Sequence, residues 1–367
     1  MFLRDLKLEA IDLKNLDFLH ISGPTASGKT DLAHFFYLSE KFSRIINADS
    51  RQFYQDLNIG TAKPSEKQQK KFNYCLIDFL KIGDPFSSHL FHEKLKSFAT
   101  KKEKTLKKDF SVDLEEKPLS KPSLIVGGPS LYTQGLFSEL PKIASSKIIR
   151  EKIEKQYLEN GLKSLLDDIS KKDPNYFLQM DRDNPRRAIR ALEVMEITEK
   201  PYSLVRKMAK TTPYRVTTIY LLRSRKELVE KIEKRTVEML ENGWLAEGEY
   251  LLEKYPPQTL EKINAVGYKH LFAKLKGDIS KEELVEKITT ETWQLAKRQM
   301  TWIKKQIRQK EDQSKRKMIV FSKEIAKLLE KNEASAESCF FDQGELQEIQ
   351  KTIPMFSEHI QYSKDFF

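Results

Sequence analysis

One eight-residue motif near the N-terminus has the composition of a phosphate-binding loop. Residues 23–30 match the pattern G-x-x-x-x-G-K-[ST] in full. The glycines let such a loop curl so that successive N–H groups point inward, and the helix that follows adds positive potential. Lys29 supplies a point charge, and the Thr30 hydroxyl can reach a Mg²⁺ ion. The predicted phosphate-binding residues are Gly23, Pro24, Thr25, Ala26, Ser27, Gly28, Lys29 and Thr30.

A carboxylate, Asp49, directly follows the second apolar run of the chain. In open α/β sheets, ligands bind at the carboxyl ends of the strands. Asp49 could therefore accept a proton from an attacking nucleophile. Helix N-caps and turns are also usual places for aspartate, and the residues alone slightly favour that structural role. A P-loop and one carboxylate fit kinases, NTPases and some transferases equally.

Short apolar runs between helical patterns predict the elements that position these residues. Because strands alternate with helices, we expect an α/β fold with a P-loop-type parallel sheet flanked by helices. The stretch 143–203 has no comparable strand signal, so it predicts a helical insertion. The predicted strands are 18–21, 44–47, 76–78, 123–126 and 216–222, with 318–321 as a possible sixth.

These elements divide the chain into four parts. We expect residues 1–142 to form the first part of the P-loop core, 143–203 a helical insertion, and 204–325 the second part of the core. Residues 326–367 are expected to form a C-terminal helix and tail. Residues 101–122 begin with a mostly charged stretch and predict an exposed loop.

The overall charge and the cysteines limit the class of protein. A net charge of +11 suits a polyanionic partner and equally fits a lysine-rich solvated surface. Cys75 and Cys339 lie far apart without a CxxC pattern, which argues against a disulfide scaffold or a zinc cluster. No apolar run approaches the length of a membrane span. We therefore expect a cytoplasmic protein without a membrane partner.

Several motifs together resemble the tRNA dimethylallyltransferases, also called isopentenyl-diphosphate:tRNA transferases. They appear in the order typical of that family and cover roughly residues 17–305. The P-loop alone is unspecific, whereas the set is highly specific. Besides the P-loop, the matching segments are INADSRQFY at 46–54, IGTAKP at 59–64, LID at 76–78, VGG at 126–128, DNPRRAIRALEV at 183–194, NAVGYK at 264–269 and LAKRQMTW at 295–302.

The resemblance implies a reaction and a role for individual residues. A dimethylallyl group would pass from dimethylallyl diphosphate to N6 of an adenosine in tRNA, the one 3′ of the anticodon, with release of pyrophosphate. Asp49 would be the general base, and Lys29 and Arg235 would hold the diphosphate. Mg²⁺ would bind at Thr30. Apart from the resemblance, we expect the protein to act as a monomer. The implied tRNA contacts are Asp49, Ser50, Arg51, Gln52, Pro129, Arg150, Arg186, Arg187, Ala188, Ile189 and Arg190.

One departure from the family affects the substrate side of the site. Where the family has GGT, this chain has Pro129 as the third residue, which removes a hydroxyl unless Ser130 replaces it. Two assignments depend on the resemblance. Without it, an ordinary surface role for the three arginines of DNPRRAIR is favoured over an RNA contact. Residues 297–299 fit a structural clamp and an RNA contact equally.

Three other functions share part of these features. A P-loop kinase of a small metabolite would share the loop, and a prenyltransferase of free adenine nucleotides would also share Asp49. A non-enzymatic RNA-binding module would explain only the charge. ATP could occupy the loop, because its amides recognise phosphate rather than base, but we expect ATP to be neither required nor stimulatory.

Overall fold

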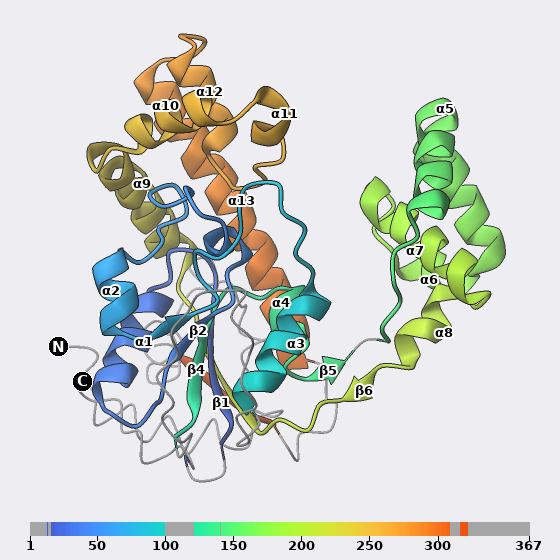
Figure 1. Cartoon of the computed structure of the whole chain (residues 1–367), viewed down its shortest axis with the longest axis horizontal. Coiled ribbons are helices and arrows are strands. Elements are labelled where there is room, and N and C mark those ends of the chain that lie inside the picture. Colours follow the sequence, from blue (N-terminus) through green and yellow to red (C-terminus); the bar gives the residue numbers. More distant parts are fainter. Residues whose placement is uncertain (1–12, 14–15, 100–120, 140, 309–315, 322–367) are drawn as a thin grey trace, which may run out of the picture. The chain divides into compact units, whose positions relative to one another are not determined.

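A parallel sheet forms the centre of the larger of the two compact units of the protein (Figure 1). The computed structural model describes residues 13, 16–99, 121–139, 141–308 and 316–321. Within them the sheet has the strand order β3-β2-β4-β1-β7-β8, and every pairing is parallel. The predicted parallel α/β sheet is therefore confirmed, including its sixth strand. The strands are β1 Phe18–Ser22, β2 Ile45–Asn47, β3 Tyr74–Cys75, β4 Ser123–Val126, β7 Val216–Leu221 and β8 Arg316–Phe321.

The strand predicted at 76–78 is wrong, because β3 ends at Cys75. Leu76 and Asp78 have φ values of 57° and 54°, in the left-handed region that a strand does not use. The Asp78 carboxylate instead accepts hydrogen bonds from Lys63 and Gln69. A short apolar run does not distinguish a strand from a buried turn, and these polar contacts were not visible in the sequence.

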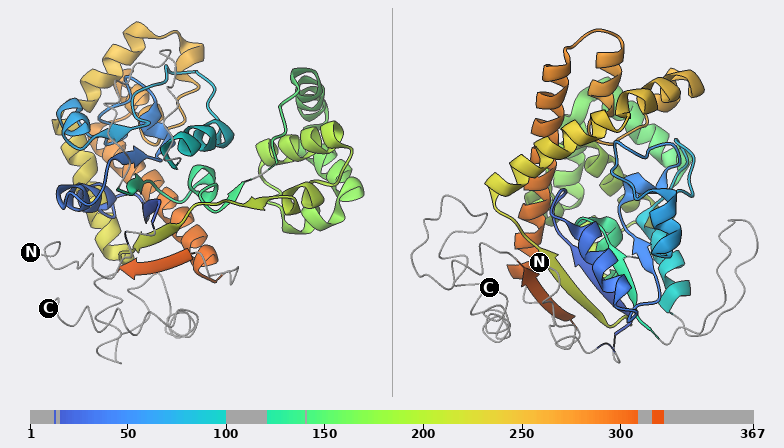
Figure 2. Two further views of the ribbon diagram at one scale, coloured as in Figure 1. Left: turned by 60° about the horizontal axis from the view of Figure 1, so that its bottom comes forward. Right: turned by 90° about the vertical axis from the view of Figure 1, so that its left-hand side faces the viewer.

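Helices surround the sheet and begin at recognisable caps. Helix α9 starts after Ser224, whose hydroxyl and the Glu227 side chain form a reciprocal capping box. Helices α9 and α13 pack against each other through Leu228, Ile232 and Ala296 (Figure 2). The helices of this part are α1 Lys29–Leu38, α2 Glu66–Lys71, α3 Ser88–Ala99, α4 Leu131–Gln134, α9 Arg225–Glu241, α10 Trp244–Lys254, α11 Pro257–Leu260, α12 Tyr268–Leu275 and α13 Lys281–Arg308, with the 3₁₀ helix η3 at Ser50–Phe53.

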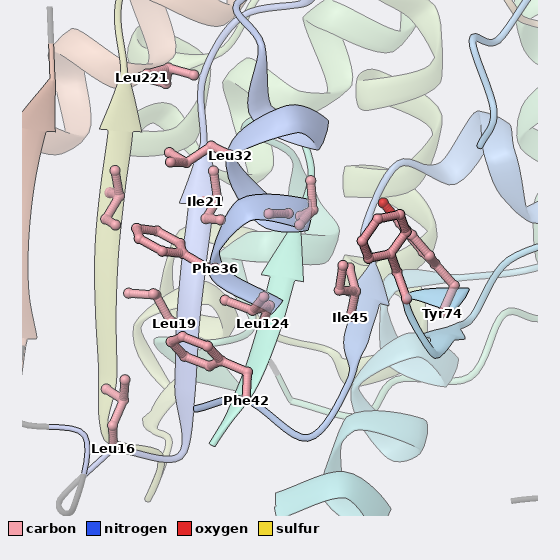
Figure 3. Packing of buried hydrophobic residues seen from close by; sticks show 14 of the residues in the cluster. Leu16, Leu19, Ile21, Leu32, Phe36, Phe42, Ile45, Tyr74, Leu124 and Leu221 are labelled. Atoms are coloured by element: carbon pink, nitrogen blue, oxygen red, sulfur yellow. The ribbon is translucent and has the colours of Figure 1, made fainter. Parts of the chain in front are cut away.

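The main apolar core lies between the sheet and α1 (Figure 3). Leu19 and Ile21 project from the same face of β1, because strand residues alternate between the two faces. They pack with Leu32 and Phe36 of α1, and all four side chains are almost completely buried. This packing fixes α1 against β1, and with it the loop that joins them.

A second apolar core fixes the segment that follows η3. Trp244 of α10 and Tyr268 of α12 are fully buried and contact each other edge to face. Leu57 packs into the same cluster, and Ile59 lies at its edge. The loop from η3 to α2 is therefore attached to α10 and α12, although about 190 residues separate them in the sequence.

The chain forms a separate compact unit from Gly135 to Pro213, inserted between α4 and β7. Figure 2 shows its helices in green and yellow-green. The helices share a core that includes Leu165, Ile169, Ala188 and Leu192. Its elements are β5 Ser138–Glu139, β6 Lys210–Thr211, α5 Lys147–Lys172, α6 Pro174–Gln179, α7 Pro185–Thr198 and α8 Tyr202–Lys207, with β5 and β6 paired antiparallel.

Two predicted segments fall outside the described residues, namely most of the 101–122 loop and the whole C-terminal part 326–367. In the part of the chain that the structure describes, no helix has the length and apolarity needed to cross a membrane.

Candidate active site

The phosphate loop occupies the turn between β1 and α1. Gly28 adopts φ 94°, in the left-handed region, and forms the N-cap of α1. The helix therefore begins at Lys29, with its N-terminal amides at the end of the loop. The Lys29 ammonium donates a 2.6 Å hydrogen bond to the carbonyl oxygen of Pro24, across the loop. This is the local geometry that the motif predicts.

A cavity of about 850 Å³ opens beside the loop. Gly28, Lys29 and Thr30 form one wall, and α9 contributes Arg235 from more than 200 positions further along the chain. The third wall is residues 58–69, which contain the IGTAKP segment. The fold thus brings the two predicted diphosphate cations, Lys29 and Arg235, to one cavity.

Burial and neighbouring charges change the ionisation of both cations. Burial lowers the pKa of Lys29 to about 8, the Asp49 carboxylate opposes this shift, and the positive charge of Arg235 adds to it. Burial also lowers the pKa of Arg235, against the opposing effect of Asp49 and Glu238. Two partly desolvated cations near each other favour a multiply charged anion between them.

The position of Asp49 is compatible with both roles that the sequence left open, a helix cap and a proton acceptor. Its Oδ1 accepts a 2.9 Å hydrogen bond from the backbone N–H of Arg51, so the side chain caps η3. Asp49 also follows β2 at the carboxyl end of the sheet, and its charge acts on Lys29 and Arg235. The cap uses one oxygen, and the other oxygen takes no part in it.

Two side chains from distant parts of the chain hold the phosphate loop, and only Arg223 had no role predicted from the sequence. The Nε–H of Arg223 donates a 2.8 Å hydrogen bond to the carbonyl oxygen of Ser27. The Oε1 of Gln299 accepts a 2.8 Å hydrogen bond from the backbone N–H of Thr25. For Gln299 the structure therefore provides the clamp, one of the two predicted alternatives. Arg223 had no distinguishing signal beyond its position after a strand that pairs with β1.

Of the remaining residues expected beside the substrate base, Gln52 makes hydrogen bonds within the protein and the others are half-buried. Gln52 donates from Nε2 to the carbonyl oxygens of Thr61 and Ala62, at 3.1 and 3.2 Å. Ser50 and Arg51 are half-buried in η3, and Pro129 is half-buried after β4. The hydroxyl of Ser130 accepts a hydrogen bond from the backbone N–H of Thr133, so it serves a turn at the start of α4.

The arginines of the helical unit differ in how much of their charge is already paired. Arg190 donates to the buried Glu193 at 2.7 Å and to the carbonyl oxygen of Ile143 at 3.0 Å. Arg150 lies 3.0 Å from Glu154, and Arg187 lies 3.3 Å from Asp181. Arg186 is exposed and makes no ion pair with another described residue.

Two residues between these arginines face the opposite side of α7. The side chains of Ala188 and Ile189 are buried in the core of the unit, 0% and 6% exposed. Their side chains pack inside the unit, whereas Arg186 and Arg187 on the same helix are exposed.

Four carboxylate side chains line the cavity together with Thr30, namely Asp31, Glu66, Asp78 and Glu238. No group of three or more His, Cys, Asp or Glu side chains with metal-binding geometry occurs among the described residues. Thr30 lines the cavity beside Lys29. A hydroxyl next to phosphate oxygens matches the way Mg²⁺ is usually bound, with several of its ligands supplied by water and substrate. The residues present fit an ion that arrives with a diphosphate.

Comparisons with known proteins show the family of the chain. The family described as IPP transferase matches residues 52–306. The tRNA dimethylallyltransferase 2 of Parabacteroides distasonis is 32% identical over 289 residues, covering 77% of this chain and 89% of that protein. The tRNA dimethylallyltransferase of Chloroherpeton thalassium is 35% identical, covering 77% and 85%.

A solved structure extends the likeness to three dimensions. The crystal structure of a eukaryotic dimethylallyltransferase acting on tRNA is similar with a TM-score of 0.62 and 25% identity, covering 78% of this chain and 70% of that one. With the family match and the identity to these relatives, the chain belongs to the IPP transferase family, the family of the tRNA dimethylallyltransferases.

Proposed function

We propose that this protein transfers a dimethylallyl group from dimethylallyl diphosphate to N6 of an adenosine in tRNA. One observation carries the proposal. Lys29 and Arg235 line a single cavity at the P-loop, and the charge of Asp49 acts on both of them. A site for a diphosphate therefore lies next to a carboxylate that can accept a proton. The relatives named above support tRNA as the acceptor.

The donor would bind through its diphosphate. The loop amides and the start of α1 supply hydrogen-bond donors, and the two cations neutralise charge. Thr30 would hold a Mg²⁺ ion together with the diphosphate oxygens, and that ion would help to neutralise the leaving group. In the structure Lys29 donates a hydrogen bond to the carbonyl oxygen of Pro24. When the donor binds, Lys29 would give up this hydrogen bond and contact a phosphate oxygen instead.

The reaction would be a substitution at the allylic carbon C1 of the donor. The bond from N6 to C1 forms, the bond from C1 to the diphosphate oxygen breaks, and Asp49 takes the proton that N6 loses. Pyrophosphate leaves with the bonding electron pair. Lys29, Arg235 and the loop amides would stabilise the charge that develops on it, the kind of electrostatic contribution that dominates such sites.

The acceptor adenosine would have to leave its stack to reach this site. Enzymes that modify a base inside a structured RNA extrude it into the active site. We propose that this adenosine is the one 3′ of the anticodon, and that the arginine-bearing face of α7 contacts the tRNA backbone. We further propose that the protein acts as a monomer in the cytoplasm.

The test is a reconstituted transfer assay. Purified protein, unmodified tRNA, Mg²⁺ and dimethylallyl diphosphate are incubated, and the nucleosides of the digested tRNA are separated by mass. We expect N6-dimethylallyladenosine, and no product when free AMP, ADP or ATP replaces tRNA. Product on the free nucleotides but not on tRNA would favour the adenine-nucleotide prenyltransferase instead.

A further inference from the structure

One carboxylate holds three consecutive backbone amides of the cavity wall. Oε2 of Glu247, on α10, accepts hydrogen bonds from the N–H groups of Asn58 and Ile59, at 2.9 and 2.7 Å. Oε1 accepts from the N–H of Gly60 at 3.2 Å and from the Tyr268 hydroxyl at 2.7 Å. Successive N–H groups converging on one point form a nest for an anion, and here a side chain of the protein fills it.

The packing around this contact leaves the segment little freedom. A Cβ atom on Gly60 would lie 2.2 Å from the indole nitrogen of Trp244, so only glycine fits there. Trp244 is itself buried against Tyr268. Two residues of α10 therefore hold residues 58–60 in place. Glu247 does so through hydrogen bonds, and Trp244 through van der Waals contact with Gly60.

The segment 58–62 also contacts both the donor cavity and the residues near Asp49. Asn58, Ile59 and Ala62 line the cavity that holds Lys29 and Arg235. The carbonyl oxygens of Thr61 and Ala62 accept hydrogen bonds from Gln52, three residues after Asp49. The same short segment is thus a wall of the donor cavity and a support for the η3 helix that Asp49 caps.

We propose that Glu247 is a positioning residue for prenyl transfer, an inference that rests on the proposed function. It acts by fixing residues 58–62, which line the donor cavity and support η3. Without the carboxylate, three amides are left without their shared acceptor, and a charge-assisted hydrogen bond is among the stronger polar contacts in proteins. The wall and Gln52 would then shift together.

The first experiment compares Glu247→Gln with Glu249→Gln. Glu249 is an exposed carboxylate on the same helix and serves as the matched control. For Glu247→Gln we expect a donor KM raised roughly tenfold or more, the scale of removing a hydrogen bond to a charged group. We also expect a slower single-turnover transfer, and a tRNA Kd that changes by less than the donor KM. Wild-type KM and single-turnover rate in Glu247→Gln would overturn the proposal.

Tyr268→Phe is a milder second variant, which keeps the carboxylate and removes one hydrogen bond to it. It should change donor KM in the same direction but by less, and it is informative if Glu247→Gln does not fold. An unchanged donor KM in a folded Tyr268→Phe together with an unfolded Glu247→Gln would count against positioning and assign Glu247 to stability alone.

Chemical rescue tests whether a carboxylate at this position, rather than a general gain in stability, lowers the donor KM. In Glu247→Ala the three amides of residues 58–60 remain as an unfilled nest, and added formate can occupy it. Formate should lower the donor KM of Glu247→Ala, whereas chloride at the same ionic strength should not. Formate should leave Glu249→Ala unaffected, and equal effects on both variants would overturn the proposal.

Hydrogen exchange separates this inference from the proposed function. The amides of residues 58–60 should exchange faster in Glu247→Gln than in the wild type, with or without a prenyl donor. If the wild type shows this protection but transfers no prenyl group to tRNA, the proposed function fails while the attachment by Glu247 stands. If exchange at these amides is unchanged in the variant, the positioning role fails.

Discussion

The guanidinium of Arg223 holds the peptide group that joins Ser27 to Gly28, by donating to the Ser27 carbonyl oxygen over 2.8 Å. Because the peptide bond is planar and trans, the N–H of Gly28 points away from Arg223. Gly28 lines the donor cavity, so this contact orients an amide that a diphosphate would use. The charge of Arg223 also polarises the same peptide group.

Arg223→Ala is therefore expected to weaken donor binding. We expect donor KM to rise roughly tenfold, the scale of removing one charged hydrogen bond. The tRNA Kd should stay the same, because the Arg223 guanidinium acts on the phosphate loop through the carbonyl oxygen of Ser27. Steady-state kinetics with each substrate varied in turn would measure both. Lys226→Ala removes an exposed cation three residues away and is the control; equal effects in the two variants would contradict an oriented contact.

The lowered pKa of Lys29 predicts a pH dependence in the alkaline range. Lys29 must be charged to hold the diphosphate, and its pKa in the free protein is about 8. The charged fraction falls as the pH rises through that value, so kcat/KM for the donor should decline above it. A bound diphosphate should raise the pKa of Lys29, so kcat should decline only at higher pH.

Lys29→Arg is the matched control for this pH dependence. A guanidinium stays charged throughout that range, so the decline that stems from residue 29 should disappear even if the rate is lower. The ionisation of the donor itself is common to both proteins and cancels in the comparison. Identical alkaline profiles for the wild type and Lys29→Arg would rule out Lys29 as the titrating group.

Asp49→Asn should separate the base from the cap. The Asn side chain still has an oxygen that can accept from the N–H of Arg51, so η3 and the melting temperature should be preserved. Loss of the base should slow single-turnover transfer by roughly 10²–10⁴-fold. Normal single-turnover rates in the folded variant would leave Asp49 with the cap alone.

Arg186 and Arg187 should behave differently from Arg190. Neutralising the first two should flatten the salt dependence of tRNA binding by about one unit of slope for each phosphate that an arginine no longer neutralises. Arg190→Ala should instead destabilise the helical unit by about 1–3 kcal/mol, because it removes a partner of the buried Glu193. Binding titrations at several salt concentrations and thermal unfolding would distinguish the two; an unaltered slope in the double variant would assign Arg186 and Arg187 to the ordinary surface.

What the sequence predicted correctly was carried by local patterns. Residues 18–30 combine a buried strand, a glycine-rich turn and a helix start, and each of these is encoded within a few neighbouring positions. The strand predicted at 76–78 was wrong because the local apolar pattern does not include the hydrogen bonds that Asp78 accepts from Lys63 and Gln69. The positions of Arg223 and Glu247 depend on partners about 190 residues away, and no local pattern encodes such a pairing.

The most direct test of the central claim is a single-turnover reaction with enzyme in excess over tRNA, followed with and without ATP. We expect one N6-dimethylallyladenosine and one pyrophosphate per tRNA modified, at the same rate in both reactions, with no ADP. In Lys29→Ala both products should form more slowly by orders of magnitude. ADP release that requires ATP, without any prenylated adenosine, would contradict the account and favour a kinase.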